Sequence, residues 1–213
     1  YLAMANLPLE QIKELYYKEG LTAQQVGSKL GTTSSAVFKF MRKEGLPRRS
    51  FQQINKKRFD QKPLSFNPKK RLTDKEQILQ ATGIMLYWGE GTKEGHNVEF
   101  SNSDPRMVQI FLRFLRDLYR IDESRLRVYL YCYGDQNVEG LKSYWSKTTN
   151  IPLSQFTKPY IRKDYYRKNI REMQYGLAHI RYSDTKLLAH LKDLIEQYAQ
   201  LWVGIQTVNG VTL

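Results

Sequence analysis

Few residues of this 213-residue chain could carry covalent or metal chemistry. The most distinctive is Glu90, which stands between Gly89 and Gly91 at the end of a stretch with helical apolar spacing. The pattern predicts a helix that ends in a carboxylate at a glycine-flanked tip. The single cysteine, Cys132, excludes an internal disulfide and a cysteine-based zinc site. The three histidines share no i, i+4 spacing, so histidine-based zinc or HNH-type chemistry is not expected.

The charge of the chain points to a polyanionic partner. Lys and Arg number 34 against 21 Asp and Glu, which gives a net charge of +13. Residues 1–71 hold 15 of the basic residues and five acids, so +10 of that charge lies in the first third of the chain. Such a balance is typical of proteins that bind nucleic acid. The longest apolar run, 84–88, is too short to cross a membrane and no signal-peptide pattern is present. We therefore expect no membrane partner and a cytoplasmic protein, nucleoid-associated in a prokaryote.

The length suits one ordinary domain with a small module attached, and residues 1–46 have the pattern of such a module. A helical stripe over 9–18 ends before Gly20, and Thr22 with Gln25 forms a capping box that opens a short helix. Gly31 ends that helix, and Thr32 or Thr33 caps a third one. The prediction is three helices with a glycine turn before the last.

The segment GLTAQQVGSKLGTTSSAVFKFMRKEGL resembles the helix-turn-helix of resolvase-like and other bacterial DNA-binding proteins over about 25 residues. Gly27 stands where that family needs a small residue, and the resemblance implies that the third helix enters the major groove. The expected groove contacts are Ser34, Ser35 and Lys39, and the expected backbone or minor-groove contacts are Arg42, Arg48 and Arg49. The alternative is a three-helix bundle that contacts protein.

Residues 47–71 are interpreted as a basic linker. The stretch 42–71 has 11 basic residues and two acids, three prolines and few aliphatic side chains, so it cannot bury a core of its own. Its cations, Lys56, Lys57 and Arg58 among them, are expected to contact phosphates. The alternative is a tether that serves only solubility.

Residues 72–213 predict a larger α+β domain. The pattern gives a helix begun by Asp74, a hairpin over 91–102 and a helix after Asp104 and Pro105. A strand over 125–133, a helix over 139–149, strands over 155–162 and 175–182 and a last helix from Asp184 follow. The order is αββαβ, an inserted helix, then ββα.

Two stretches of this domain combine basic and aromatic side chains. The strand at 125–133 alternates an apolar face with a face that carries Arg125, Arg127, Tyr129 and Tyr131. That face suits DNA, although exposed tyrosines are also good strand formers. The stretch 158–171 interleaves tyrosines with cations and is interpreted as a DNA-ordered loop, with a flexible surface loop as the alternative. Its expected DNA contacts are Lys158, Arg162, Lys163, Arg167 and Lys168.

The sequence TGIMLYWGEG, followed by a hairpin, NSDP at a helix start and a returning strand, resembles a LAGLIDADG domain, the fold of homing endonucleases, over about 130 residues. The resemblance implies a homodimer through the 74–90 helix, with Glu90 and the Gly89 carbonyl as ligands of Mg²⁺ for phosphodiester hydrolysis. The sheet would straddle double-stranded DNA. Lys93 is a candidate cation beside a phosphate, with a solvated charge as the alternative.

Two functions follow from these patterns. The first is a sequence-specific, Mg²⁺-dependent DNA endonuclease, which the retained Glu90 favours because a carboxylate facing phosphates would otherwise only repel them. The second is a non-cleaving transcriptional regulator with a degenerate LAGLIDADG domain. The helix-turn-helix favours the regulator, and so does Met85, which occupies the position where the motif has a small residue.

Overall fold

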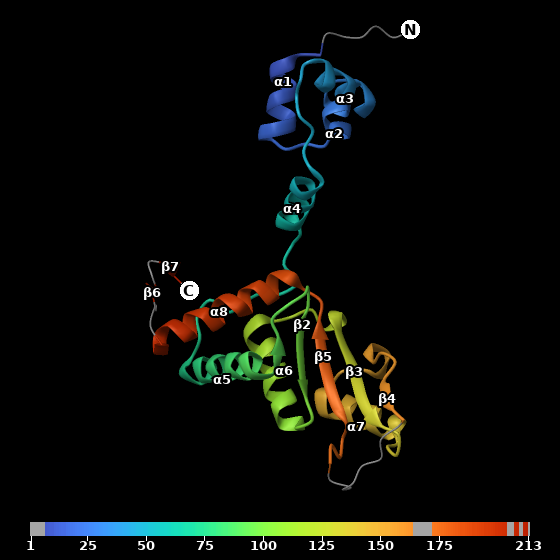
Figure 1. The fold of residues 1–213 in the computed structure, drawn as a ribbon, viewed down its shortest axis with the longest axis vertical. Coiled ribbons are helices and arrows are strands. Elements are labelled where there is room, and N and C mark those ends of the chain that lie inside the picture. The colour runs from blue at the N-terminus through green and yellow to red at the C-terminus, as the bar shows by residue number, and fades with distance from the viewer. Residues whose placement is uncertain (1–6, 164–171, 204–206, 209–210, 213) are drawn as a thin grey trace. The chain divides into compact units, whose positions relative to one another are not determined.

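The computed structural model describes residues 7–163, 172–203, 207–208 and 211–212. The chain divides into two compact units, Tyr1–Pro63 and Leu64–Leu213 (Figure 1). The larger unit combines helices with one five-stranded sheet, so the α+β prediction is confirmed. No helix among the described residues has the length and apolar character needed to cross a membrane.

The small unit contains the three predicted helices and a fourth. Leu9–Lys13 (α1) continues into a π-helical turn, Glu14–Lys18 (η1), and Ala23–Lys29 (α2) and Ser34–Lys43 (α3) follow. The capping box at the start of α2 is confirmed, since the Gln25 N–H donates to the Thr22 hydroxyl and the Gln25 side chain accepts from the Thr22 N–H. Thr33 caps α3.

A close approach fixes the turn between α2 and α3. A Cβ on Gly27 would lie 2.8 Å from the Thr32 carbonyl oxygen, so only glycine fits there. Gly31 has a φ of +65°, the left-handed conformation that glycine adopts without strain. The helices enclose a small core whose fully buried members are Ile12, Val26, Val37 and Met41. The turn thus holds α3 against α2 in a set geometry.

The segment 47–71, predicted as a basic linker, is not a single irregular tether. Phe51–Gln61 forms a helix (α4), opened by a reciprocal pair of hydrogen bonds between Ser50 and Gln53. Residues from Leu64 onward belong to the larger unit. Phe66 is buried in that unit's core, and the backbone N–H groups of Asn67 and Lys69 donate to carbonyls at the end of a helix of that unit. The composition of 47–71 gave no sign of a contact with a core. Burial of Phe66 alone is enough to anchor the end of the segment to the larger unit.

The larger unit has its elements in the predicted order. Thr73, rather than Asp74, caps the first helix through a capping box with Glu76. The elements are α5 (Asp74–Glu90), β1 (Gly91–Thr92), β2 (Val98–Asn102), α6 (Pro105–Tyr119), the turn η2 (Glu123–Arg125), β3 (Leu126–Tyr133), α7 (Val138–Thr149), the turn η3 (Leu153–Gln155), β4 (Tyr160–Arg162), β5 (Leu177–Tyr182) and α8 (Thr185–Val203). Two short strands, β6 (Thr207–Val208) and β7 (Val211–Thr212), pair with each other.

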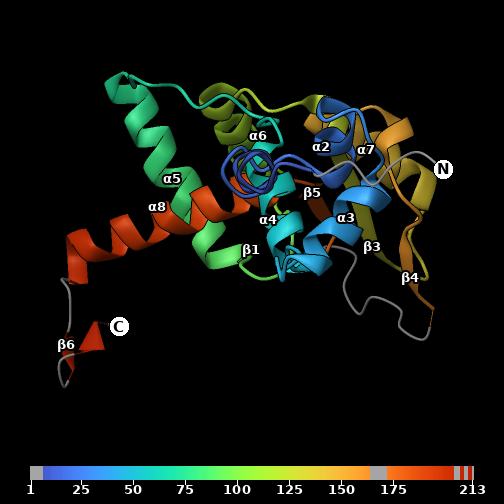
Figure 2. The ribbon, with the colours of Figure 1, turned by 90° about the horizontal axis from the view of Figure 1, so that it is seen from above.

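The five strands lie in the order β1-β2-β5-β3-β4. All neighbours are antiparallel except β4, which runs parallel to β3 after the crossover through α7. The two views agree that α6 and α7 lie on one side of the sheet (Figures 1 and 2). Side chains of β2, β3 and β5 that point to that side are buried with residues of α5, α6, α7 and α8. The sheet therefore has one covered face and one face on which no described helix of the larger unit packs.

Aromatic rings fill the covered side. Phe111 of α6 stacks on Phe100 of β2 and on Tyr87 of α5, with centroids 4.4 and 5.6 Å apart. A Cβ on Gly83 would lie 2.2 Å from Cγ of Phe114, so α5 approaches α6 closely through that glycine. Gly83 thus faces α6 of its own chain, so it is not free to make a contact between two α5 helices.

A polar cluster joins the start of the unit to its last helix. Asp184, which caps α8, accepts from the Ser65 hydroxyl at 2.5 Å and lies 3.6 Å from an Arg125 nitrogen. The Tyr182 hydroxyl donates to the Ser65 carbonyl at 2.7 Å. Burial acts to raise the pKa of Asp184, but the hydrogen bonds from Ser65 and from backbone N–H groups outweigh it and lower that pKa.

Candidate nucleic-acid interface

The uncovered side of the sheet carries polar, basic and aromatic side chains in register. Side chains alternate between the two faces along each strand, and residues paired directly across two strands lie on the same face. The register therefore identifies every residue that points outward. We call this surface the open sheet face. Its members are Thr92, Glu99, Ser101, Arg127, Tyr129, Tyr131, Tyr160, Leu177, His179 and Arg181. None of these ten residues is buried. Tyr133 and Arg162, one step further along β3 and β4, point to the same side, and of these two Tyr133 is buried.

Cross-strand contacts order the centre of this face. Arg181 of β5 pairs with Glu99 of β2, with 2.7 Å between nitrogen and oxygen. In the next row, the Ser101 hydroxyl and Nδ1 of His179 are 2.6 Å apart, and Tyr129 meets the same imidazole edge to face at 5.3 Å. These contacts hold hydrogen-bonding groups in fixed positions, as recognition of a rigid partner requires.

Tyrosines dominate the β3–β4 side of the face. Tyr131 stacks on Tyr160 with centroids 5.2 Å apart, and Tyr133 meets Tyr131 edge to face. Half of the Tyr160 side chain is exposed. The parallel β4 therefore extends the open sheet face with an aromatic surface that could stack on bases.

The two arginines predicted on β3 differ in their contacts. Arg125 lies in the turn before the strand, not on its outer face, and its guanidinium contacts Asp184 and the Ser183 carbonyl. Its contact with DNA stays a prediction. Arg127 belongs to the open sheet face and is exposed, although one of its nitrogens donates to the Ser124 and Leu126 carbonyls. Arg127 thus remains able to reach a phosphate.

Sequence reasoning missed the β2 and β5 part of this face. Glu99, Ser101, His179 and Arg181 come from segments 78 or more residues apart, and only strand pairing brings them together. A signal was present, since the alternation along 177–182 places His179 and Arg181 on one face. Without the register, neither residue could be joined to its partner on β2.

A second candidate surface lies on α3 of the small unit. Ser35, Lys39 and Arg42 are exposed, and Ser34 is half-buried at the start of the helix. Arg48 is also exposed, and its guanidinium lies 4.1 Å from the centre of the Phe38 ring. These five residues occupy the outward side predicted for a recognition helix and its flank.

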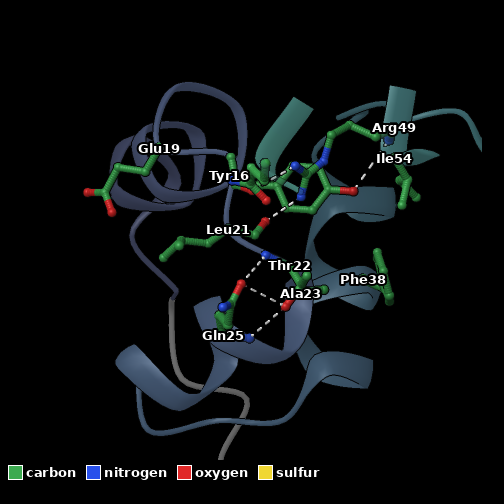
Figure 3. Close-up of a pocket in the computed structure, with 11 residues that line it drawn as sticks. Tyr16, Glu19, Leu21, Thr22, Ala23, Gln25, Phe38, Arg49 and Ile54 are labelled. Atoms are coloured by element: carbon green, nitrogen blue, oxygen red, sulfur yellow. Dashed lines mark hydrogen bonds between the residues drawn. The ribbon is translucent and has the colours of Figure 1, made fainter. Parts of the chain in front are cut away.

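Arg49 has a structural role instead. Its guanidinium lies 4.2 Å from the centre of the Tyr16 ring and donates to the carbonyls of Gly20 and Leu21, as Figure 3 shows. Together with Thr22 and Phe38, these residues line a pocket of about 420 Å³. The donors of Arg49 hold the segment after α3 against the end of the first helix, and its contact with DNA stays a prediction.

Glu90 is placed as predicted, at the C-terminal end of α5, where it and Gly89 are exposed. No hydrogen bond or ion pair of its carboxylate appears among the described residues. Lys93, by contrast, donates to the Trp88 carbonyl, so it caps the end of α5 and its predicted phosphate-side role is not supported. In the described part of the chain, no group of three or more His, Cys, Asp or Glu side chains is arranged to hold a metal ion.

The exposed side of α5 leads to Glu90. Ile78, Thr82, Met85 and Gly89 lie on one helical stripe, opposite the buried Gly83, Ile84 and Tyr87. Ile78 is 68% exposed and Met85 41%. The Thr82 hydroxyl donates to the Ile78 carbonyl, so its methyl group remains to face outward. The stripe is therefore largely apolar and has no partner among the described residues.

The remaining predicted cations lie on several elements. Lys56 is exposed on α4, which also includes Lys57 and Arg58, whose side chains are not described. Lys158 and Lys163 are exposed on either side of β4, and Arg162 is exposed within it. Arg167 and Lys168 lie outside the described residues.

Comparisons with protein-family models, with curated proteins and with solved structures found no match for this chain.

Proposed function

We propose that this protein binds double-stranded DNA in a sequence-specific manner through both of its units. The observation that carries the proposal is the open sheet face, where Arg127, His179 and Arg181 lie beside tyrosines on a surface that no described helix of the larger unit covers. Cations supply the non-specific attraction to phosphates, and fixed polar groups supply contacts to base edges.

The small unit supports the same function independently. Gly27 and Gly31 set the angle of α3, and the exposed Ser35, Lys39 and Arg42 follow its outer side. A helix of this kind fits the major groove of B-DNA, which is about 12 Å wide. Two binding surfaces in one chain would raise affinity by making the second contact intramolecular.

The reaction we propose for the bound duplex is site-specific phosphodiester hydrolysis. Glu90 is exposed at the helix tip directly before β1, the strand that begins at Gly91. Its carboxylate and the Gly89 carbonyl are oxygen ligands of the kind that Mg²⁺ takes, together with waters and substrate phosphates. When bound, such an ion would supply an activated water and neutralise charge on the leaving oxygen. The role of Glu90 is to hold the ion.

One chain offers only half of a paired site. Among the described residues, Glu90 belongs to no group of three or more His, Cys, Asp or Glu side chains that could hold a metal ion. The apolar stripe of Ile78, Thr82, Met85 and Gly89 leads to Glu90, and we propose that it pairs with the same stripe of a second copy. A two-fold contact is self-complementary, and if its axis runs along the two helices it would place one Glu90 from each copy at the same end of the interface.

A non-cleaving transcriptional regulator is the second candidate function. The observation that favours it is Met85, whose long side chain lies in the middle of the stripe and would hold two α5 helices apart. In that case the protein would bind DNA with the same surfaces, and the Glu90 carboxylates would lie too far apart to act on one site.

Random-site selection followed by a nicking assay tests both candidates. The duplex selected by the full chain is incubated with Mg²⁺ or Mn²⁺ and one of three proteins: wild type, Glu90→Gln or Glu94→Gln. Glu94→Gln is the matched control, because Glu94 is an exposed acid in the β1–β2 loop. The endonuclease predicts cleavage that Glu94→Gln retains and Glu90→Gln loses by orders of magnitude. Binding without cleavage by wild type would establish the regulator, and failure to select any sequence would refute specific binding.

A further inference from the structure

The middle row of the open sheet face centres on a histidine. We propose that His179 contacts the DNA duplex directly and takes up a proton when it does so, which makes binding by the sheet tighter in acid. This inference rests on the proposed DNA-binding function. It adds His179 as a contact, the imidazolium as its bound form, and a pH dependence of binding.

The position of His179 is central on the face. Its strand, β5, is the middle strand of five, and His179 pairs with Ser101 on one side and Tyr129 on the other. A duplex lying on the open sheet face would therefore pass over this row wherever else it makes contact.

The hydrogen bonds of the imidazole leave one nitrogen for a ligand. Nδ1 lies 2.6 Å from the Ser101 hydroxyl, and Nε2 has no partner among the described residues. A hydroxyl can donate to a neutral imidazole or accept from a protonated one. When Ser101 donates to Nδ1, Nε2 carries the hydrogen of the neutral ring, so Nε2 can donate to a phosphate oxygen or to O6 or N7 of guanine in either state. The proton taken up goes to Nδ1, where the Ser101 hydroxyl becomes the acceptor.

Burial and neighbouring charges act on the imidazole of His179 in the free protein. Burial lowers the pKa of His179 below its ordinary value, Glu99 on β2 raises it and Arg181 on β5 lowers it again. Arg127 on β3 adds a positive charge on the same face, and Tyr129 and Tyr131 are its aromatic neighbours there. A polyanion placed on this face would favour the imidazolium, so binding and proton uptake are coupled.

The direction of the effect follows from this coupling. At high pH, His179 is neutral in both free and bound protein and contributes no charge. As the pH falls, the bound form is protonated first, and affinity rises until the free form is protonated as well. Affinity should therefore be several-fold higher at pH 5.5 than at pH 8.5.

The test uses the full chain and a duplex selected from a random pool by the wild-type protein. Dissociation constants are measured by fluorescence anisotropy from pH 5.5 to 8.5 at constant ionic strength. His179→Gln should reduce the pH dependence to less than about twofold, because glutamine does not titrate in this range. The matched control is His96→Gln, an exposed histidine of the β1–β2 loop, which should keep the wild-type dependence.

Calorimetry in two buffers of different ionisation enthalpy counts the protons taken up on binding. Wild type should take up a fraction of a proton near pH 6.5 that His179→Gln lacks, and a circular dichroism spectrum establishes that the variant is folded. Equal pH dependence and equal proton uptake in wild type and His179→Gln would overturn the inference and leave DNA binding intact. Absence of duplex binding at every pH would overturn the proposed function as well.

Discussion

Each unit carries two arginines close together in sequence, and in each unit the two have different surroundings. In the small unit, Arg49 holds backbone carbonyls while Arg48 is exposed on the outer side of Phe38. In the larger unit, Arg125 contacts Asp184 while Arg127 belongs to the open sheet face. One cation of each pair stabilises the fold and the other is available to phosphates. Net charge alone cannot separate these two uses.

The units also differ in what holds them together. The larger unit buries stacked rings such as Phe100, Phe111 and Trp145 beneath a sheet. The small unit has few large buried side chains and depends on glycine turns, helix caps and the Arg49 contacts. A small domain buries a smaller fraction of its surface, so polar contacts contribute a larger share of its stability.

Truncation of an aromatic residue in the larger unit should have the largest effect. We expect Phe111→Ala to destabilise that unit by about 3–5 kcal/mol. The change removes a ring that stacks on Tyr87 and on Phe100, and it leaves a cavity. Tryptophan fluorescence during urea unfolding reports this unit alone, because Trp88, Trp145 and Trp202 all belong to it. The control Ile110→Ala, at a partly exposed position of α6, should cost less than about 1 kcal/mol. An equal shift of the small unit's transition would mean that the units unfold together.

Arg49→Ala should destabilise the small unit by about 2 kcal/mol. The change removes two hydrogen bonds from a charged donor and the contact with Tyr16. Far-UV circular dichroism should show an earlier transition that tryptophan fluorescence does not detect. Arg48→Ala should cost less than about 1 kcal/mol, because Arg48 is exposed. If the two variants were equally stable, the structural role of Arg49 would be wrong.

The arginines of the larger unit should separate stability from binding. Arg125→Ala is expected to lower stability by about 1–2 kcal/mol, since it leaves the buried Asp184 without its cation. Arg127→Ala should leave stability within about 0.5 kcal/mol and lower the slope of log K against log salt for a DNA duplex by about one. If Arg125→Ala lowered the slope of log K against log salt and Arg127→Ala did not, the roles of the two arginines would be reversed.

The smallest effect concerns Asp184 and pH. Its pKa is lowered from 3.8, so its contribution to stability is present above that pH and is lost as the pH falls through the lower value of the folded state. Asp184→Asn keeps a capping side chain but cannot titrate. Urea midpoints measured by fluorescence between pH 5 and 3 should therefore fall less steeply for Asp184→Asn than for wild type. Parallel curves would show that other carboxyls account for the acid sensitivity.

Local features of the fold were predictable because they depend on neighbouring residues. The Thr22 capping box, the Gly31 turn and the alternation of the strand at 126–132 are each set within a few residues, and the structure contains all of them. Glu90 at the end of α5 follows from the same local pattern. Its use in chemistry stays a prediction.

Features that depend on distant contacts were not predictable. The helix α4 has little apolar surface, so its periodicity gave no signal, and only its Ser50–Gln53 cap marks its start. The parallel pairing of β4 with β3, and the row formed by Ser101 and His179, require the register of the sheet. Which arginine of a pair is exposed likewise depends on tertiary contacts.

The helix α4 has a consequence for the length of DNA that both units can occupy. An extended chain of its 11 residues could reach about 37 Å, whereas the same residues in a helix rise only about 16 Å. On the larger unit's side, the buried Phe66 anchors the chain soon after α4 ends. The helix shortens this part of the connection by about 21 Å. We therefore expect joint binding to weaken as base pairs are inserted between the two recognition sequences.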